Sequence, residues 1–441
     1  MKKILVVICF AMLSISGLSS QTINLEEART LALANSRSLA RYEMAIRSSL
    51  LDERNQLYNL LPQVSAGYNA SMDFVRNWEF VNPADTLRTG ASFSITQIIF
   101  QGGRNFIQKA ISQISTEGVR KDALAEYFGV LDAIDNTYYA VLEATATLEA
   151  EESSLQAAVL GLSIAEIRQA SGMINQGDYL RALADKESRE NSRNQARRNL
   201  TLNMNRFRTL TGITGAVELE QINFEAYEDV ITRLAVISDE EVHKLFDEFW
   251  EIIVVLNPNL AKASLSNQRA ELNLTNTRRD YAPTISATIF STDMSFLPSY
   301  NATGRSGVTI RGTIPVDFWV LNDRIEKSRI SRDLTVLDFA SAEISLEMEL
   351  HNALLNAISQ AGSVLSARRS LEYTEKNFEF IMERYRLLQS SVSDLTEATT
   401  LFINSRNSST RVSYSFLQSL SRLRSLCAMD DEQRLLEILT R

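Results

Sequence analysis

The sequence of 441 residues is short of the side chains that most enzyme chemistries need. It contains only two cysteines and two histidines, which excludes a disulfide framework, a histidine-rich metal site and an HExxH motif. The 54 acidic residues outnumber the 45 basic ones, and a formal net charge of −9 does not suit a nucleic-acid-binding protein. We therefore expect no catalytic residue, no metal, no cofactor and no nucleic-acid partner, and predict that the protein is not an enzyme.

Proline is also rare, and the stretches 84–257 and 316–441 contain none. Because a proline inside a helix costs about 3 kcal/mol, these stretches are free to form very long helices. Residues 104–170 and 322–388 are rich in Ala, Leu, Glu, Gln and Arg. At about 1.5 Å per residue each would give roughly 100 Å of helix. Such helices are too long for the core of a compact domain, where helices average about 11–12 residues.

The second long segment also has the spacing of a coiled coil. Its core positions alternate three and four residues apart, which is the a/d seam of a left-handed supercoil. These positions are Leu371, Thr374, Phe378, Ile381, Tyr385 and Leu388. Shorter helices are predicted at about 24–60, 178–211, 240–280 and 393–438.

The N-terminus has the layout of a secretory signal peptide. Lys2 and Lys3 precede an apolar run at residues 4–13, and small residues follow it. The apolar run is too short to span a bilayer. We predict that residues 1–20 are a signal peptide and that the mature chain begins near Gln21.

Segments with a two-residue period lie between the helices. In residues 64–74 the even positions are apolar and the odd positions are polar or glycine, and the same alternation recurs at 91–96 and 308–317. We predict β-hairpins at about 63–100 and 284–317. About 9–11 alternating residues suffice for a transmembrane strand. Four strands cannot close a barrel, so several chains would have to combine.

The chain reads as two copies of one unit. Pro62 corresponds to Pro283 at an offset of 221 residues, and Arg168 corresponds to Arg384 at an offset of 216. Because the offset changes by only five residues between these two matches, the sequence indicates an internal duplication. We predict a first repeat at 21–212 with a helical hairpin at about 104–211, an irregular acidic segment at 213–239, and a second repeat at 240–441 with a helical hairpin at about 322–438.

The order of these elements resembles that of the TolC-type outer-membrane efflux proteins. The resemblance also includes Leu61-Pro62 at the start of the first strand and the turn from strand to helix at Phe100-Gln-Gly-Gly-Arg104, and it covers essentially the whole mature chain. It implies a fold that is mainly α with a small β part. It further implies a homotrimer, in which four strands per chain complete a transmembrane β-barrel that a coiled-coil α-barrel continues.

The resemblance also implies a function. The protein would be a passive exit duct of a tripartite efflux or type I secretion system, in the outer membrane of a Gram-negative bacterium, with helices extending into the periplasm. Its partners would be itself, a periplasmic adaptor protein, an inner-membrane RND- or ABC-type transporter, and outer-membrane lipid. The alternative is a periplasmic coiled-coil scaffold whose hairpins pair in water without forming a pore.

In this family the turns of the two helical hairpins form the gate. Asp394 and Glu397 lie on one helix face and match acidic residues that form rings, which would attract cations in a trimer. The alternative is that Asp394 caps the helix and Glu397 completes a capping box. Tyr385 occupies the position of a tyrosine that ties the hairpins together in the closed state, and Asp178 fits its partner carboxylate. Tyr385 also lies on the coiled-coil seam, where an ordinary packing role is equally consistent.

Two positions in the second turn depart from the family pattern. Ser390 stands where the family has an arginine of the closed-state lock, and Leu388 stands where it has a glycine. The adaptor would contact the turns from Gly172 to Gly177 and from Leu388 to Ser393.

Overall fold

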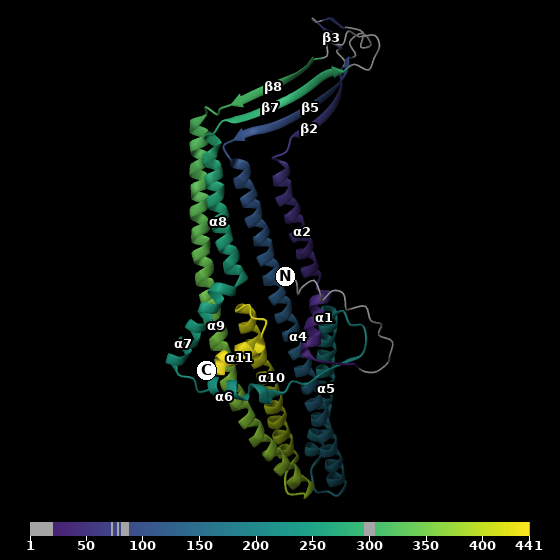
Figure 1. The fold of residues 1–441 in the computed structure, drawn as a ribbon. Helices are drawn as coiled ribbons and strands as arrows, with labels where there is room; N and C mark the ends of the chain where they lie inside the picture. The colour runs from purple at the N-terminus through teal and green to yellow at the C-terminus, as the bar shows by residue number, and fades with distance from the viewer. Residues whose placement is uncertain (1–20, 72–73, 77–78, 81–87, 295–304, 441) are drawn as a thin grey trace. The chain divides into compact units, whose positions relative to one another are not determined.

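A computed structural model describes residues 21–71, 74–76, 79–80, 88–294 and 305–440 (Figure 1). The predicted signal peptide lies outside these residues. The fold class predicted from the sequence, mainly α with a small β part, is confirmed. Within the described ranges, no helix combines the length and the apolar character needed to cross a membrane.

The chain forms two compact units, and each draws on both halves of the sequence. The first, here called the helical unit, contains the chain up to Ala40, Leu124–Pro258 and Ile344–Arg441. The second, here called the sheet unit, contains Arg41–Ala123 and Asn259–Glu343. The units therefore cut across the two sequence repeats.

Four antiparallel strands build the main sheet of the sheet unit. They are β2 (Gln63–Ser71), β5 (Arg88–Gln101), β7 (Thr284–Met294) and β8 (Arg305–Thr313). They lie side by side in the order β2-β5-β7-β8 (Figure 1). The central pair, β5 and β7, joins a strand of the first half of the chain to one of the second. Two short strands, β3 (Val75–Arg76) and β4 (Glu79–Phe80), pair with each other.

The two faces of this sheet differ in polarity. Residues that pair directly across neighbouring strands lie on the same face, and successive residues alternate between the faces. One row across all four strands is Val64, Ile95, Ile289 and Val308, and the row next to it is Gln63, Thr96, Thr288 and Thr309. Val64 and Val308 of the apolar row are 64% and 68% exposed. The sheet therefore has a polar face and an exposed apolar face.

A tight corner joins β5 to the long helix α4 (Arg104–Ala170). Gly102 and Gly103 both have positive φ, which glycine adopts without a steric penalty. A Cβ on Gly102 would lie 2.5 Å from the Cβ of Ala282, so a side chain is excluded there. Arg279 also donates a hydrogen bond of 2.9 Å to the Gly102 carbonyl. Close packing against the second half of the chain therefore explains the two glycines.

Two stretches that the sequence predicts as single helices each consist of two helices. The stretch predicted at 24–60 is α1 (Leu25–Asn35) followed by α2 (Arg37–Tyr58). The stretch predicted at 240–280 is α7 (Asp239–Leu256) followed by α8 (Pro258–Arg278), because Pro258 starts a new helix.

Two helical hairpins dominate the helical unit. The first consists of α4 and α5 (Gln176–Thr211), and the second of α9 (Phe318–Arg386) and α10 (Val392–Leu426). The helices α4 and α9 are continuous over 67 and 69 residues, and each contributes to both units. The helix predicted over 393–438 ends early, because Ala428 takes a positive φ of 50°. A separate helix, α11 (Glu432–Thr440), follows it.

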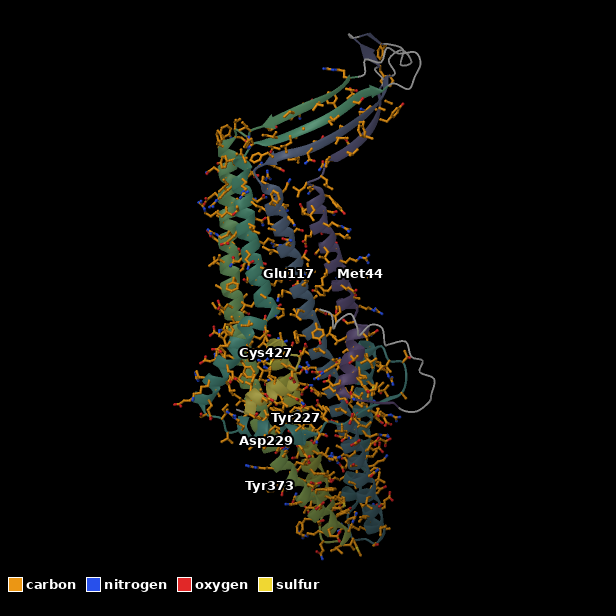
Figure 2. The ribbon with its side chains drawn as sticks, in the orientation of Figure 1. Met44, Glu117, Tyr227, Asp229, Tyr373 and Cys427 are labelled. Carbon is orange, nitrogen blue, oxygen red and sulfur yellow. The ribbon has the colours of Figure 1, made fainter. Side chains whose placement is uncertain are left out.

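The acidic segment between the repeats contains short elements. They are β6 (Val217–Leu219), the 3-10 helix η2 (Phe224–Tyr227) and α6 (Glu228–Leu234), and Tyr227 and Asp229 mark the last two in Figure 2. Strand β6 pairs in parallel with β1 (Gln21–Ile23). The Tyr138 hydroxyl of α4 lies 2.7 Å from the Glu220 carbonyl oxygen and 3.0 Å from that of Ile23, so it fixes both strands to the hairpin.

Candidate gate at the helical turns

The first turn joins α4 to α5 through a Schellman motif. Gly172 has a φ of 71°, and the N–H of Met173 donates to the Arg168 carbonyl at 2.8 Å. Asn175 then caps α5, since its side chain accepts the N–H of Asp178 at 2.8 Å. Gly172 and Gly177 are both exposed. The turn thus needs glycine at position 172 for backbone conformation alone.

The second turn has the same backbone geometry but uses leucine. Leu388 has a φ of 65°, and the N–H of Gln389 donates to the Arg384 carbonyl at 2.7 Å. A side chain in this left-handed region costs roughly 1–2 kcal/mol. The Leu388 side chain is nevertheless 49% exposed. The departure from glycine therefore preserves the turn, adds strain, and leaves an apolar side chain on its surface.

A capping box opens α10, but its members differ from those predicted. The Ser391 hydroxyl accepts the N–H of Asp394 at 3.1 Å, and the Asp394 carboxylate accepts the N–H of Ser391 at 2.9 Å. The prediction that Asp394 is the cap and Glu397 completes the box is wrong, because the helix begins at Val392 and places Asp394 at its third position. The backbone and hydroxyl hydrogen bonds from Ser391 lower the pKa of Asp394. Asp394, Glu397 and Ser393 are all exposed.

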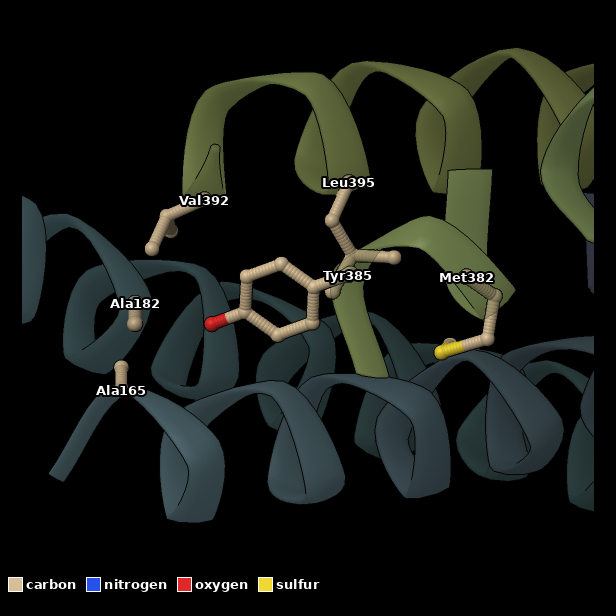
Figure 3. Packing of buried hydrophobic residues seen from close by; sticks show 6 residues of the cluster. All are labelled: Ala165, Ala182, Met382, Tyr385, Val392 and Leu395. Atoms are coloured by element: carbon tan, nitrogen blue, oxygen red, sulfur yellow. The ribbon is translucent and has the colours of Figure 1, made fainter. Parts of the chain in front are cut away.

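Tyr385 is fully buried between the two hairpins (Figure 3). Its ring packs in a cluster with Ala165, Ala182, Met382, Val392 and Leu395. Its hydroxyl donates a hydrogen bond of 3.0 Å to the Gly161 carbonyl on α4. Burial raises the pKa of Tyr385, although the nearby Arg168 guanidinium acts in the opposite direction. The Tyr385 hydroxyl donates its proton to this backbone carbonyl and not to the Asp178 carboxylate. The pairing of Tyr385 with Asp178 stays a prediction.

Arg168, on α4, is a contact residue that the sequence did not single out. Its Nη1 donates to the Ser390 carbonyl at 3.1 Å, and its guanidinium lies 5.4 Å from the centre of the Tyr385 ring. The Ser390 hydroxyl is turned inward and donates to the Ile381 carbonyl at 3.4 Å. Although Ser390 replaces the family's arginine, an arginine from the other hairpin therefore contacts the same turn. In the sequence, Arg168 is marked only as the counterpart of Arg384 in the repeat, which does not indicate this contact.

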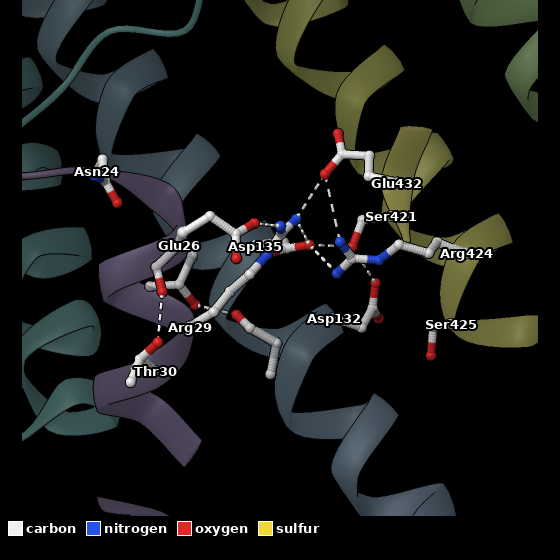
Figure 4. Close-up of polar contacts among 12 residues, drawn as sticks. Asn24, Glu26, Arg29, Thr30, Asp132, Asp135, Ser421, Arg424, Ser425 and Glu432 are labelled. Atoms are coloured by element: carbon white, nitrogen blue, oxygen red, sulfur yellow. Dashed lines mark hydrogen bonds and ion pairs between the residues drawn. The ribbon is translucent and has the colours of Figure 1, made fainter. Parts of the chain in front are cut away.

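A buried charge network lies elsewhere in the helical unit (Figure 4). Asp135 of α4 accepts hydrogen bonds from Arg29 of α1 and from Arg424 of α10, the latter at 2.6 Å. Glu432 of α11 binds Arg29 at 3.1 Å and accepts the Tyr227 hydroxyl at 2.7 Å. The network joins four helices and η2. The sequence does not predict it, because its charged residues lie in segments that are far apart along the chain. Among the described residues, no group of three or more histidine, cysteine or acidic side chains could hold a metal ion.

A chain with two long helical hairpins and a small sheet with an exposed apolar face has the fold of an outer-membrane channel. It belongs to the outer membrane efflux protein family, whose sequence profile matches residues 28–213 and 253–428. This is a family of efflux proteins and not of enzymes.

Individual relatives agree with this assignment. The chain is 22% identical to outer membrane protein TolC of Escherichia coli (strain K12) over 466 residues, covering 99% of this chain and 89% of TolC. The crystal structure of the Campylobacter jejuni outer membrane channel CmeC is similar with a TM-score of 0.74 at 16% identity, over 99% of this chain and 94% of CmeC. That of CusC is similar with a TM-score of 0.75 at 15% identity, over 95% of each chain. These structures share the fold.

Proposed function

We propose that this protein is a passive channel in the outer membrane of a Gram-negative bacterium. It would serve as the exit duct of a tripartite efflux or type I secretion system. Three copies would close one transmembrane β-barrel, with the helical hairpins in the periplasm. Docking of a periplasmic adaptor and an inner-membrane RND- or ABC-type transporter at the turns would open the channel.

The observation that carries this proposal is the polarity of the sheet. The apolar row at Val64, Ile95, Ile289 and Val308 crosses all four strands. The adjacent threonines belong to the opposite face, where the hydroxyls of Thr96 and Thr288 are 3.1 Å apart. An apolar face toward lipid and a polar face toward water is the pattern of a membrane channel.

The edges of the sheet unit support assembly from several copies. Within the described residues, β2 and β8 each pair on one side only. An open strand edge is not tolerated in lipid, so these edges need partners. If β8 paired with β2 of a neighbouring copy, three chains of four strands each would form a ring of twelve.

The helices next to these edges support the same arrangement. Helix α2 precedes β2, and Met44 (Figure 2), Leu51 and Tyr58 recur on it every seven residues. Helix α9 follows β8, and Ile330, Leu334 and Leu337 are spaced four and three residues apart. All six side chains are exposed, between 43% and 72%. Two such stripes at opposite edges fit a coiled-coil contact between neighbouring copies.

The turns offer a surface for a helical partner. Met173 in the first turn is 63% exposed, and Leu387 and Leu388 in the second turn are 58% and 49% exposed. Apolar side chains held on exposed turns suit a protein contact. The exposed Asp394 and Glu397 lie at the start of α10 and would form the rings that favour cations.

The test is single-channel recording from the full-length, detergent-extracted protein in a planar bilayer, together with its mass in detergent. We expect a trimer and small, cation-selective conductance steps. A protein that stays soluble and monodisperse without detergent and gives no steps would instead be the periplasmic scaffold. A trimer that needs detergent but gives no steps would retain the membrane assembly and overturn the open-pore part of the proposal.

A further inference from the structure

A groove in the helical unit has a chemistry that the proposed channel function does not use. It has a volume of about 690 Å³ and is formed by α4, α5, α10 and the segment that contains β6 and η2. We propose that this groove binds an organic cation, an ammonium group that carries an aromatic or aliphatic part. The inference adds a binding site to the proposed exit duct and does not depend on conduction through it.

The floor of the groove is apolar because one face of α4 and one face of α5 line it. Val141, Leu142 and Ala146 lie on the same side of α4, since they are one and four residues apart. Leu200 and Met204 line the groove from α5 and are four residues apart, one above the other on that helix. Such a floor can hold the hydrocarbon part of a ligand.

The segment that follows the first hairpin forms a wall of the groove and is held in place. Its strand β6 pairs with β1, and the Tyr138 hydroxyl of α4 lies 2.7 Å from the Glu220 carbonyl oxygen. The Phe224 ring of η2 meets the Tyr414 ring of α10 edge to face, with 5.5 Å between the ring centres. Because these contacts already fix the wall, binding needs little further ordering of the chain.

The lining of the groove carries negative charge only. Glu149 of α4 and Glu218 of β6 line it, and none of its lining residues is a lysine or an arginine. Burial raises the pKa of Tyr414 to about 12, and the charges of Glu143 and Glu149 add to this effect, so both carboxylates act at the aromatic wall. Arg411 acts on Glu143 but does not line the groove. A groove with this charge attracts cations.

The mixed lining favours an organic ammonium group over a metal ion. Phe224 and Tyr414 offer ring faces, which attract ammonium groups. The hydroxyls of Ser409 and Ser413 on α10 can accept hydrogen bonds from a protonated amine. A metal ion would need several converging ligands, and the described residues contain no group of three or more histidine, cysteine or acidic side chains that could hold one. The volume lies within the range of about 300–1,000 Å³ typical of sites for small organic ligands.

The experiment measures binding of benzyltrimethylammonium to the full-length protein in a non-ionic detergent by isothermal titration calorimetry, with the titration into detergent alone subtracted. We expect saturable binding of one cation per chain. The variant Glu149→Gln with Glu218→Gln should weaken binding about tenfold, because it removes both charges of the lining. The matched control is Glu152→Gln with Glu225→Gln, which removes exposed charges from the same helix and the same segment outside the lining, and should stay within about twofold of the parent protein.

Two further ligands and one further variant test the apolar part of the site. Tetramethylammonium has the charge without the ring and should bind several-fold more weakly, whereas benzenesulfonate has the ring with the opposite charge and should not bind. Phe224→Leu removes a ring from the wall and should weaken binding of benzyltrimethylammonium several-fold. Equal binding of the two cations, together with no effect of Phe224→Leu, would overturn the assignment to an organic cation.

Three other outcomes would overturn the site itself. They are unchanged binding in the double glutamate variant, binding of benzenesulfonate as tight as that of the cation, and no saturable binding to the parent protein, as would follow if a neighbouring copy covers the groove. If circular dichroism shows that the double variant does not fold, Glu149→Gln alone replaces it, and unchanged binding there has the same meaning. No current is measured, so failure of the proposed channel function would leave these results valid.

Discussion

Both carboxylate oxygens of Asp135 are bound by Arg29, one by Nε at 2.7 Å and the other by Nη2 at 2.8 Å. The Asp135 side chain is fully buried, and only 8% of the Arg29 side chain is exposed. This pair fixes α1 to the middle of α4, although the two residues are 106 positions apart in the sequence. The contact explains how the N-terminal helix is held against the first hairpin.

Breaking this pair should destabilise the helical unit strongly. In Asp135→Ala, the guanidinium groups of Arg29 and Arg424 stay buried without their common carboxylate, and we expect the free energy of unfolding to fall by about 3–5 kcal/mol. Thermal unfolding in detergent, followed by circular dichroism, measures the effect. The control is Glu372→Ala, which removes an exposed pair with Lys376 and should barely move the midpoint. A small shift for Asp135→Ala would show that the network adds nothing to stability.

Acid should weaken the same network through Glu432. Burial acts to raise the pKa of Glu432, but Arg29, Arg424 and the Tyr227 hydroxyl outweigh it, and the net effect is a pKa below the ordinary value of 4.5. A lowered pKa means that the unfolded chain binds the proton more readily, so the stabilisation is complete above pH 4.5 and is lost as the pH falls through the folded value.

The variant Glu432→Gln isolates this contribution. We expect the difference in unfolding midpoint between the parent protein and the variant to be constant from about pH 7 down to pH 5 and to shrink at lower pH. A difference that grows on acidification would have the wrong sign for a carboxylate with a lowered pKa.

The charges near the second turn should set ion selectivity. Asp394 also belongs to the capping box, so we pair Asp394→Asn with Glu397→Gln, which removes both charges while the amide oxygen of the asparagine can still accept the Ser391 N–H. We expect the ratio of cation to anion permeability to fall several-fold without loss of the trimer. The reversal potential in a salt gradient measures this ratio, and an unchanged value would leave the two residues with a structural role only.

Replacing Leu388 by glycine and replacing Gly172 by a larger residue should change the stability of the two turns in opposite directions. Leu388→Gly removes a side chain from the left-handed region and should stabilise the turn by about 1 kcal/mol, whereas Gly172→Ala should destabilise the first turn by a similar amount. Hydrogen exchange at each turn measures these changes. If Leu388 contacts the adaptor, Leu388→Gly should also weaken adaptor binding despite its greater stability.

Neighbouring residues on β7 offer a test of the membrane face. Ile289 lies in the apolar row and Thr288 in the polar row, so a lysine at one position would face lipid and at the other would face water. A lysine toward the middle of the bilayer costs about 2–4 kcal/mol. We expect Ile289→Lys to lower the yield of trimer in the outer-membrane fraction, and Thr288→Lys to leave it unchanged. Equal yields would argue against lipid at this face.

Local patterns in the sequence determined the secondary structure and the fold class. The proline-free stretches became α4 and α9, and the two-residue alternation marked the strands, because helix and strand periodicity depend on neighbouring residues. The duplicated spacing gives the order of these elements along the chain, and this order is what resembles the efflux family.

Contacts between distant segments were decided only by the tertiary structure. The partners of Tyr385 and Arg168 lie more than 200 positions away. Asp135 likewise meets Arg29 only because α1 packs on α4. The sequence therefore determines what each segment is, whereas packing between segments decides which side chains meet, because no local periodicity encodes a distance across the fold.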